Sequence, residues 1–402
     1  MRIAFLISST DALATTHFSF ELARTLAARG HEVTFIAVSV KRRFRPEWEF
    51  REGVRILFTP KGVTGRWHYG GWGLLDILTR IVHLAREPYD VLVSVECRAN
   101  VYLPFRAMSG RIPLRLTAWG DWWGENGLAA CSNRLRVLQR WEEKWNKTIR
   151  LEADGVLVAS RVLAALANEW GIPEERLCLI PHGSPVDRIQ VLPKEAARRR
   201  IGLDENQPVI GYLSHTLPPL LPALPALSRV FVRHPRATLL CIGRCADEPR
   251  EPLERAGVAD HVRFSGPLPA AEIEHWLACA DVLLVPSLPN SMFYEAKSPG
   301  KLGDYLAAGR PVVAPDIGET ARIIREDGAG LLSGSDMSDL DEPICRLLED
   351  PVLAERIGAQ ARQAAEAHYA WPILAARFER FVRDLPGKQD MVPAPFCMPT
   401  RH

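Results

Sequence analysis

Short apolar runs alternate along the chain with longer stretches in which apolar residues recur at helical spacing. Runs of about four to eight residues that are rich in β-branched side chains and bounded by turn residues are typical of buried strands. Seven such runs predict strands at residues 2–8, 31–38, 54–59, 90–95, 111–119, 153–160 and 176–181. Helical patterns occupy residues 17–30 and 135–151. Strands that alternate with helices predict a parallel sheet covered on both faces.

The same alternation starts again after an irregular stretch at residues 180–193. Six more strands are predicted at residues 208–214, 237–243, 261–266, 281–287, 310–315 and 328–333, with helices at 269–280, 300–309 and 350–384. We therefore expect an α/β protein with two Rossmann-like domains, residues 1–185 and 186–370, facing across a cleft. A C-terminal helix at about 371–385 is expected to pack back on the first domain, and residues 386–402 to form a flexible tail.

Composition and charge exclude some classes of protein. The 402 residues carry a formal net charge of +2, too small to indicate nucleic acid as a partner. The apolar run near the N-terminus has only five residues, so we interpret it as a strand rather than a secretion signal. No run approaches the roughly 18 apolar residues of a membrane span. The eight cysteines are scattered, which is typical of free thiols in a reducing compartment and favours a cytoplasmic protein.

The stretch from residue 281 to residue 319 is the most informative for chemistry. A buried strand leads into a loop and then into a helix that begins near Ser298 and Pro299. Ser298 can cap the helix, and Gly300 lets a ligand approach the backbone closely. The helix N-terminus favours a phosphate, and Lys301 adds a full charge at the same end. Asp304 lies one turn further on, where a carboxylate can accept hydrogen bonds from a ribose diol.

Two other phosphate-binding motifs do not fit this stretch. A P-loop is excluded because Glu295 stands at the position of its first glycine and Leu302 at that of its Ser or Thr. The dinucleotide fingerprint G-x-G-x-x-G is absent. An ordinary strand–loop–helix unit with a surface lysine and aspartate remains the alternative.

The segment SPGKLGDYLAAGRPVVAP resembles the donor-site signature of family 4 retaining glycosyltransferases of the GT-B fold. ELARTLAARGHEVTFIAV, LIPHGSPVD and VRFSGPLPAAEIEHWLACADVLLVPS are similar to other parts of that family, so the resemblance covers most of residues 1–370. It implies transfer of a sugar from a nucleoside diphosphate to a hydroxyl acceptor with retention, for example in envelope glycan, glycolipid or natural-product glycoside synthesis. UDP or GDP is the favoured nucleotide, and no cofactor is required.

The resemblance also implies roles for single residues. Lys301 would contact the donor diphosphate together with Ser298 and Gly300, and Asp304 would hold the ribose. Residues 289–297 would line the donor sugar. Relatives often carry a glutamate where this chain has Ala296, so the neighbouring Glu295 is only a candidate for the sugar hydroxyls. The turn expected to border the nucleobase consists of Ser265, Gly266 and Leu268.

The chain departs from the family pattern at the donor phosphates. The loop after the first strand lacks the expected pair of glycines. Its Thr15, Thr16 and His17 can bind phosphate or acceptor, or can be a helix cap and a surface histidine. His215 stands near the position of an expected arginine and no lysine follows, although Arg244 can compensate. A catalytically weak or inactive sugar-nucleotide-binding protein is therefore the alternative function.

Aromatic residues mark candidate acceptor contacts in the first domain. Trp119, Asp121 and Trp122 follow a predicted strand, where loops display ligand-binding side chains. Asp121 is a catalytic candidate that can hydrogen-bond the transferred sugar or the incoming hydroxyl, and Trp67 is a further acceptor candidate. The alternative for Trp119 to Trp122 is a structural aromatic turn.

Basic and aromatic residues are mixed at residues 41–50, 61–73 and 134–150. Such surfaces suit the headgroup region of an anionic membrane, which predicts peripheral contact with its inner face. An acceptor loop and an ordinary packed helix are the alternative. Asp339 and Asp341 match a metal-binding D-x-D pattern but begin a predicted helix, where acidic residues are favourable, so we expect no essential metal.

Overall fold

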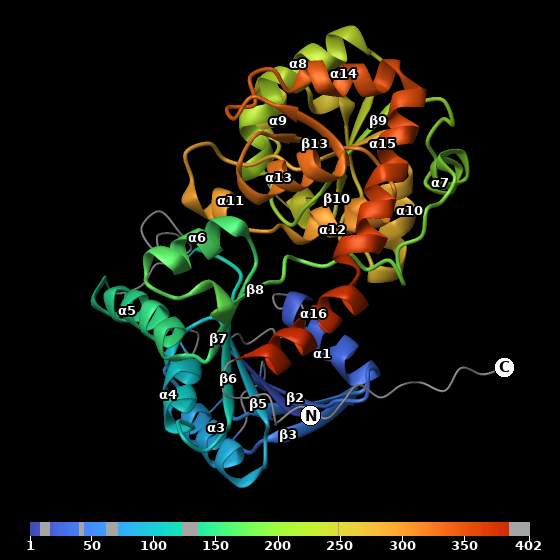
Figure 1. The fold of residues 1–402 in the computed structure, drawn as a ribbon. Coiled ribbons are helices and arrows are strands. Elements are labelled where there is room, and N and C mark those ends of the chain that lie inside the picture. The colour runs from blue at the N-terminus through green and yellow to red at the C-terminus, as the bar shows by residue number, and fades with distance from the viewer. Residues whose placement is uncertain (9–16, 40–43, 62–70, 123–135, 248, 386–402) are drawn as a thin grey trace, which may run out of the picture. The chain divides into compact units, whose positions relative to one another are not determined.

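The structure is a computed structural model that describes residues 1–8, 17–39, 44–61, 71–122, 136–247 and 249–385 (Figure 1). Its contacts divide the chain into two compact units. The first unit reaches Ile180 and takes in the chain again from Leu374, whereas the second unit runs from Pro181 to Ile373.

Eight strands form the sheet of the first unit. They are β1 (Arg2–Ile7), β2 (Glu32–Val38), β3 (Glu47–Arg51), β4 (Val54–Thr59), β5 (Val91–Val95), β6 (Leu114–Trp119), β7 (Gly155–Val158) and β8 (Leu177–Leu179). Their order is β3-β4-β2-β1-β5-β6-β7-β8, and only the β3–β4 pair is antiparallel. The helices are α1 (His17–Ala28), α3 (Leu74–Arg86), α4 (Ala99–Ala107), α5 (Arg136–Glu152) and α6 (Arg161–Glu169), with a 3-10 turn η1 (Glu174–Arg176).

The core of the first unit covers both faces of its central strands. Five consecutive residues of β1, from Ile3 to Ile7, are buried, which is the pattern of a strand with helices on either side. The Phe5 ring stacks on Phe35 of β2 at 6.2 Å, and Phe20 of α1 meets Phe35 edge-on at 5.6 Å. These contacts place α1 directly against the central strands.

Strand β3 was not predicted from the sequence. Its residues are almost all exposed, so it lacks the buried apolar run by which the other strands were found. It is joined to β4 by a tight turn in which Glu52 and Gly53 both have positive φ, 48° and 82°. Two such residues form the turn whose twist matches an antiparallel hairpin.

Six strands form the parallel sheet of the second unit. They are β9 (Val209–Leu213), β10 (Thr238–Ile242), β11 (Val262–Phe264), β12 (Val282–Leu284), β13 (Val312–Pro315) and β14 (Gly330–Ser333), in the order β11-β10-β9-β12-β13-β14. The longer helices are α7 (Lys194–Arg200), α8 (Leu224–Arg233), α10 (Ile273–Ala278), α12 (Gly300–Ala307), α13 (Gly318–Asp327), α14 (Asp341–Glu349) and α15 (Pro351–Ala364). The shorter elements are α9 (Glu251–Arg255), α11 (Met292–Ala296), η2 (Pro218–Ala223), η3 (Arg244–Asp247), η4 (Ala259–His261) and η5 (Ala270–Glu272).

Two apolar clusters lie on opposite faces of this second sheet. Ile210 and Tyr212 of β9 belong to one cluster together with α8 and α14. Val209 of the same strand and Leu240 of β10 belong to the other, together with α12 and α15. Because successive side chains of a strand point to opposite faces, this division shows a sheet covered on both sides. The predicted α/β class with two Rossmann-like parallel sheets is confirmed.

The long helix predicted at residues 350–384 is interrupted. After α15 the chain widens into a π-helical turn, η6 (Ala365–Tyr369), and Ala370 is extended at φ −57° and ψ 137° before α16 (Trp371–Asp384) begins. Pro372 suits a first helical turn because it has no N–H to place there. Within the first unit, Glu379 of α16 pairs with Arg29 at 2.7 Å and with His31 at 2.9 Å.

Among the helices that the structure describes, none is both long enough and apolar enough to cross a bilayer.

Candidate functional site

Three loops at the carboxyl edge of the second sheet are tied together by backbone contacts. Ser214, after β9, donates its N–H to the Ile242 carbonyl at 2.9 Å. Gly243, after β10, donates to the Ser265 hydroxyl at 2.9 Å and forms a bridge with Gly266. A Cβ at Gly243 would stand 2.6 Å from the Ser214 carbonyl oxygen. This edge of a parallel sheet is where open α/β folds bind ligands.

The first turn of α12 is seated closely against residues 182–184. A Cβ at Gly300 would stand 2.9 Å from the His182 ring, and one at Gly303 would stand 2.3 Å from the Gly183 carbonyl oxygen. A side chain at position 303 would therefore collide with the backbone, whereas one at position 300 would require the His182 ring to move.

Ser298 does not have the capping role that the sequence predicted. Pro299 is the N-cap of α12, and no side chain caps this helix end. The Ser298 hydroxyl instead accepts a hydrogen bond from the His182 N–H at 3.0 Å. The partner comes from a segment 116 residues away, so the local pattern could not indicate it.

Lys301 lies in the same first turn and is half-buried. Its Nζ lies over the ring of Tyr212, 4.5 Å from the ring centroid, which joins the start of α12 to the end of β9. Desolvation, together with the nearby charge of Lys297, lowers the pKa of Lys301 to about 7, although Cys245 and Asp304 act in the opposite direction. A bound anion would supply the negative charge that this environment lacks.

Two tyrosines fix the end of β9 beneath Lys301. Tyr305 of α12 accepts the Leu213 N–H at 2.7 Å through its hydroxyl. Tyr212 donates its hydroxyl to the Thr216 carbonyl at 3.0 Å, and burial raises the pKa of both tyrosines. Both phenols are thus held as neutral packing and hydrogen-bonding groups.

Lys297 of the preceding loop is a second cation held by aromatic rings. Its Nζ lies 4.0 Å from the Tyr294 ring centroid and 4.7 Å from that of Phe293. Sequence analysis missed His182 and Tyr212 as site residues, and it placed Lys297 at the end of the donor-sugar loop without identifying it as a cation beside Lys301. Lys297 stands four residues before Lys301, which was the available signal.

The other predicted donor residues occupy different positions along the sheet edge. His215 and Arg244 are exposed after β9 and β10, and Asp304 is half-buried on α12. The Ser265 hydroxyl donates to the Gly266 carbonyl at 2.7 Å, so it is engaged with the backbone. Leu268 packs against the apolar cluster that contains α12.

Glu295 lies on α11, at the β13 side of the same edge. Its backbone is so close to Gly318 that a Cβ there would stand 2.1 Å from the Glu295 carbonyl oxygen. Ala296 is fully buried, whereas Glu295 is half-buried. The neighbouring Glu319, at the start of α13, is buried and is bonded by Arg322 at 2.6 Å.

In the first unit, Trp119 is a packing residue. It is only 2% exposed, and its ring stacks on Trp170 at 4.8 Å with the Arg150 guanidinium 4.2 Å from its centroid. Its indole N–H donates to the Asp121 carbonyl at 3.1 Å. The prediction that Trp119 presents its ring to an acceptor is therefore wrong, because neighbouring side chains already cover it.

Trp122 and Asp121 remain half-buried at the end of β6. The Trp122 ring lies 6.4 Å from Trp119 and 6.3 Å from Trp170, so three indoles gather there. Of the other predicted acceptor residues, Thr15, Thr16 and Trp67 lie outside the described residues. His17 begins α1, and its side chain also lies outside what the structure describes.

The D-x-D pattern forms contacts within the protein. Asp339 accepts the Gly334 N–H at 2.8 Å, and Asp341 pairs with Arg229 in the first turn of α14. Each of the two carboxylates thus has a partner within the protein.

Two family models match the chain over most of its length. "Glycosyl transferases group 1" matches residues 207–350, and "Glycosyl transferase 4-like domain" matches residues 16–183. The chain belongs to the group 1, family 4-like glycosyltransferases.

Its relatives include a GDP-mannose-dependent monoacylated alpha-(1-6)-phosphatidylinositol monomannoside mannosyltransferase of Corynebacterium glutamicum. That protein is 28% identical over 48% of this chain and 51% of its own length. D-inositol 3-phosphate glycosyltransferase of Frankia alni is 26% identical over 91% of this chain and 93% of its own. The matched stretch thus spans about half of the first of these relatives.

Solved structures share the fold. Sucrose-phosphate synthase of Thermosynechococcus elongatus superposes with a TM-score of 0.76 at 20% identity, covering 96% of this chain and 99% of its own. Anabaena HepE in complex with UDP-glucose superposes with a TM-score of 0.71 at 15% identity, covering 96% and 100%. The predicted GT-B fold is confirmed.

The close contact between α12 and residues 182–184 can be tested by adding a side chain at one of the two glycines. Gly303→Ala should lower the free energy of unfolding by about 1–3 kcal/mol, because its Cβ would meet a backbone oxygen that cannot move aside alone. Urea unfolding followed by tryptophan fluorescence measures the change. Gly120→Ala is the control, since a Cβ there meets no atom within 4 Å. Equal stability of both variants would contradict the close contact.

Proposed function

We propose that the protein transfers a sugar from a nucleoside diphosphate to a hydroxyl acceptor with retention of configuration. The observation that carries this proposal is Lys301, a half-buried cation in the first turn of α12 with a pKa of about 7. Within the described part of the chain, its ammonium contacts the Tyr212 ring and no carboxylate pairs with it. Such a group is suited to binding a diphosphate, which restores the missing negative charge.

The positive charge in this scheme comes from Lys301 and the α12 N-terminus. Both favour the negative charge that develops on the leaving diphosphate. Ser298 and Gly300 shape the approach to this helix end, and Asp304, one turn on, is proposed to hold the ribose hydroxyls. Exposed Arg244 and His215 can reach an anion outside the sheet edge, and the Ser265–Leu268 turn is proposed to border the base.

Retention needs no protein nucleophile in a front-face reaction. The bond from the sugar carbon to the diphosphate oxygen breaks, and the acceptor oxygen bonds to that carbon on the same face. The acceptor proton passes to the leaving phosphate oxygen. The protein then orients the partners, with Glu295 proposed for sugar hydroxyls and Asp121 for the sugar or the incoming hydroxyl. We propose that the reaction needs no metal ion.

The relatives support two nucleotides and two kinds of acceptor. A relative uses GDP-mannose, and a structural neighbour binds UDP-glucose. One relative is named for a phosphatidylinositol monomannoside acceptor and another for D-inositol 3-phosphate. We propose UDP or GDP as the nucleotide and a hydroxyl of a glycan, lipid or small molecule as the acceptor.

An exposed apolar surface in the first unit favours a membrane-associated acceptor. Leu74, Leu78 and Val82 are spaced four residues apart on α3 and are 70%, 48% and 44% exposed. The exposed Trp48 of β3 meets His83 of α3 at 5.3 Å, so strand and helix share this surface, and Phe50 adds a further exposed ring. Three aliphatic residues along one helix face suit the headgroup boundary of a bilayer.

Cations accompany this surface. The Arg55 guanidinium lies 4.9 Å from the Trp48 ring centroid. Arg45 precedes β3 and Arg51 is its last residue, although Arg51 pairs with Glu49. Basic groups beside apolar ones favour anionic lipid. We propose that this surface, β3 with the exposed face of α3, contacts an anionic membrane.

The alternative is a protein that binds a sugar nucleotide without efficient transfer. It is favoured by His215, which stands where relatives often have an arginine, and by the absence of the lysine that often follows. Both functions predict nucleotide binding. Turnover of a sugar nucleotide with an acceptor extract separates them.

The donor site predicts selective stabilisation by one nucleoside diphosphate. Thermal unfolding with UDP, GDP, dTDP, ADP or CMP should show one ligand that adds about 2.7 kcal/mol at a hundred times its dissociation constant. EDTA should not change the shift, and Lys301→Ala and Asp304→Asn should remove it. Lys144→Ala, at an exposed lysine of α5, is the matched control. If none of the diphosphates stabilises the protein, the proposed donor site is wrong.

Lys301 predicts a pH dependence of diphosphate binding. The free ammonium is charged below pH 7 and loses its proton above it, whereas a bound diphosphate raises the pKa again. Affinity should therefore fall by up to roughly tenfold per pH unit from pH 7 towards pH 9. Calorimetry across this range measures it. Lys301→Arg should flatten the profile because arginine stays charged; a wild-type profile as flat as that of Lys301→Arg would refute the assignment.

The membrane surface predicts binding to anionic vesicles. Wild-type protein should sediment with vesicles of phosphatidylglycerol and phosphatidylcholine but not with phosphatidylcholine alone. Leu74→Ser combined with Leu78→Ser should reduce the bound fraction severalfold, because the apolar contact is lost. Val232→Ser with Val352→Ser, at two residues of the second unit that are 81% and 77% exposed, should leave binding unchanged. Equal loss in both double variants would argue against this surface.

A further inference from the structure

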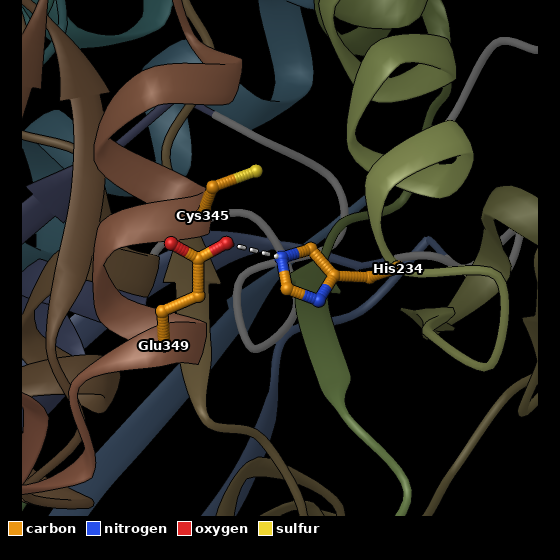
Figure 2. Close-up of side chains that lie close together, drawn as sticks. All are labelled: His234, Cys345 and Glu349. Atoms are coloured by element: carbon orange, nitrogen blue, oxygen red, sulfur yellow. Dashed lines mark hydrogen bonds and ion pairs between the residues drawn. The ribbon is translucent and has the colours of Figure 1, made fainter.

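Three side chains with different ligand atoms converge where α8 meets α14 in the second unit (Figure 2). His234 follows the last residue of α8, and Cys345 and Glu349 lie one turn apart on α14. The His234 Nε2 lies 3.1 Å from the Glu349 Oε1, and the ligand atoms of all three residues lie within 4.8 Å of one another. Figure 2 shows the imidazole and the carboxylate pointing toward each other beside the thiol.

The backbone and the core hold these residues in place. The His234 N–H donates to the Val230 carbonyl at 2.7 Å, and the His234 carbonyl accepts the Ala237 N–H at 2.9 Å. Cys345 is only 3% exposed and belongs to the apolar cluster that α8 and α14 share. Residues four apart on a helix lie on the same face, so the thiol and the Glu349 carboxylate face α8 together.

Arg233 orients the carboxylate. Its guanidinium pairs with the Glu349 Oε2 at 2.5 Å, while the Oε1 faces His234. One carboxylate oxygen is thus held by a cation and the other remains directed at the imidazole. In known metal sites, a partner of this kind holds the orientation of the ligand and affects the affinity for the metal.

We propose that His234, Cys345 and Glu349 bind a zinc ion, with solvent in the fourth position. Thiolate, imidazole and carboxylate are the ligands that zinc takes, whereas magnesium and calcium take oxygen ligands. Tetrahedral bonds of about 2.0–2.3 Å place ligand atoms about 3.3–3.8 Å apart. Side-chain rotations at the half-buried His234 and the exposed Glu349 that move their ligand atoms by about 1 Å would bring the atoms to this spacing. Zinc binds the Cys345 thiolate with release of the thiol proton, and it binds the Nε2 of a neutral imidazole whose proton is on Nδ1.

The proposed zinc site is separate from the site of sugar transfer. Figure 1 shows α8 and α14 at one end of the second unit and α11 and α12 at the other. An ion there joins the two helices and stabilises the unit without touching Lys301. Sequence analysis missed the site because His234 and Glu349 are 115 residues apart, and Cys345 was treated as one scattered thiol.

Metal binding to the full-length protein tests the site directly. After removal of metals with a chelator, the protein is titrated with Zn²⁺ against a chromophoric competitor, and separately with Co²⁺. We expect one zinc per chain and a near-ultraviolet thiolate-to-cobalt charge-transfer band. Cys345→Ala and His234→Gln should each lower zinc affinity by at least about 100-fold, and Arg233→Gln by about 10–100-fold. Circular dichroism and thermal unfolding verify that each variant is folded.

The chain contains a matched control in the same unit. His275 of α10 and Cys279, which follows the last residue of that helix, have the same four-residue spacing as Cys345 and Glu349, but the Cys279 thiol donates to the His275 carbonyl. His275→Gln and Cys279→Ala should leave zinc binding and the cobalt band unchanged. The proposal is overturned if the cobalt band is missing, or if Cys345→Ala and His234→Gln bind zinc as tightly as the control variants do. Either result would mean that the cluster is an ion pair and not a metal site.

Discussion

The position of Lys301 at the carboxyl edge of the second sheet depends on how closely α12 approaches the backbone of residues 182–184. A Cβ at Gly303 would stand 2.3 Å from a backbone oxygen and one at Gly300 would meet the His182 ring, so glycine at both positions allows the helix start to lie directly against this backbone. The contact fixes the first turn, which carries Lys301, at the end of β9. A cation positioned by backbone packing needs no flexible side-chain network to hold it, and such preorganisation lowers the cost of meeting a ligand.

Much of this arrangement follows from local sequence. The inner strands β9, β10, β12 and β13 of the second sheet are buried on both faces and therefore appear as apolar runs. Helix-start chemistry identified Lys301 and Asp304 as neighbours. The resemblance of SPGKLGDYLAAG to the donor-site signature of the family predicted the GT-B fold. The local sequence thus predicted where the carboxyl edge of the second sheet lies and that α12 begins there with a charged residue. The aromatic setting of Lys301 was not part of the prediction, because Tyr212 lies 89 residues before it, inside a strand.

The features that sequence analysis missed are decided by distant contacts. Strand β3 is exposed on both faces and is defined only by pairing with β4. Trp119 looked like a loop residue available to a ligand, yet Trp170 and Arg150 cover it. The Ser298 hydroxyl bonds a backbone N–H from the segment before β9 and not its own helix. In each case a tertiary contact overrides a correct local preference.

The cations at the two ends of the second unit are held in different ways. Lys301 rests on the face of the Tyr212 ring, whereas Arg233 and Arg229 pair with the carboxylates of α14. A ring face attracts an ammonium without neutralising its charge, so the field of that cation remains available to an incoming anion. A carboxylate partner cancels that field at the protein surface. The second unit therefore presents positive charge at the carboxyl edge of its sheet. Where α8 meets α14, the charges of the arginines and carboxylates balance each other beside the proposed metal ligands.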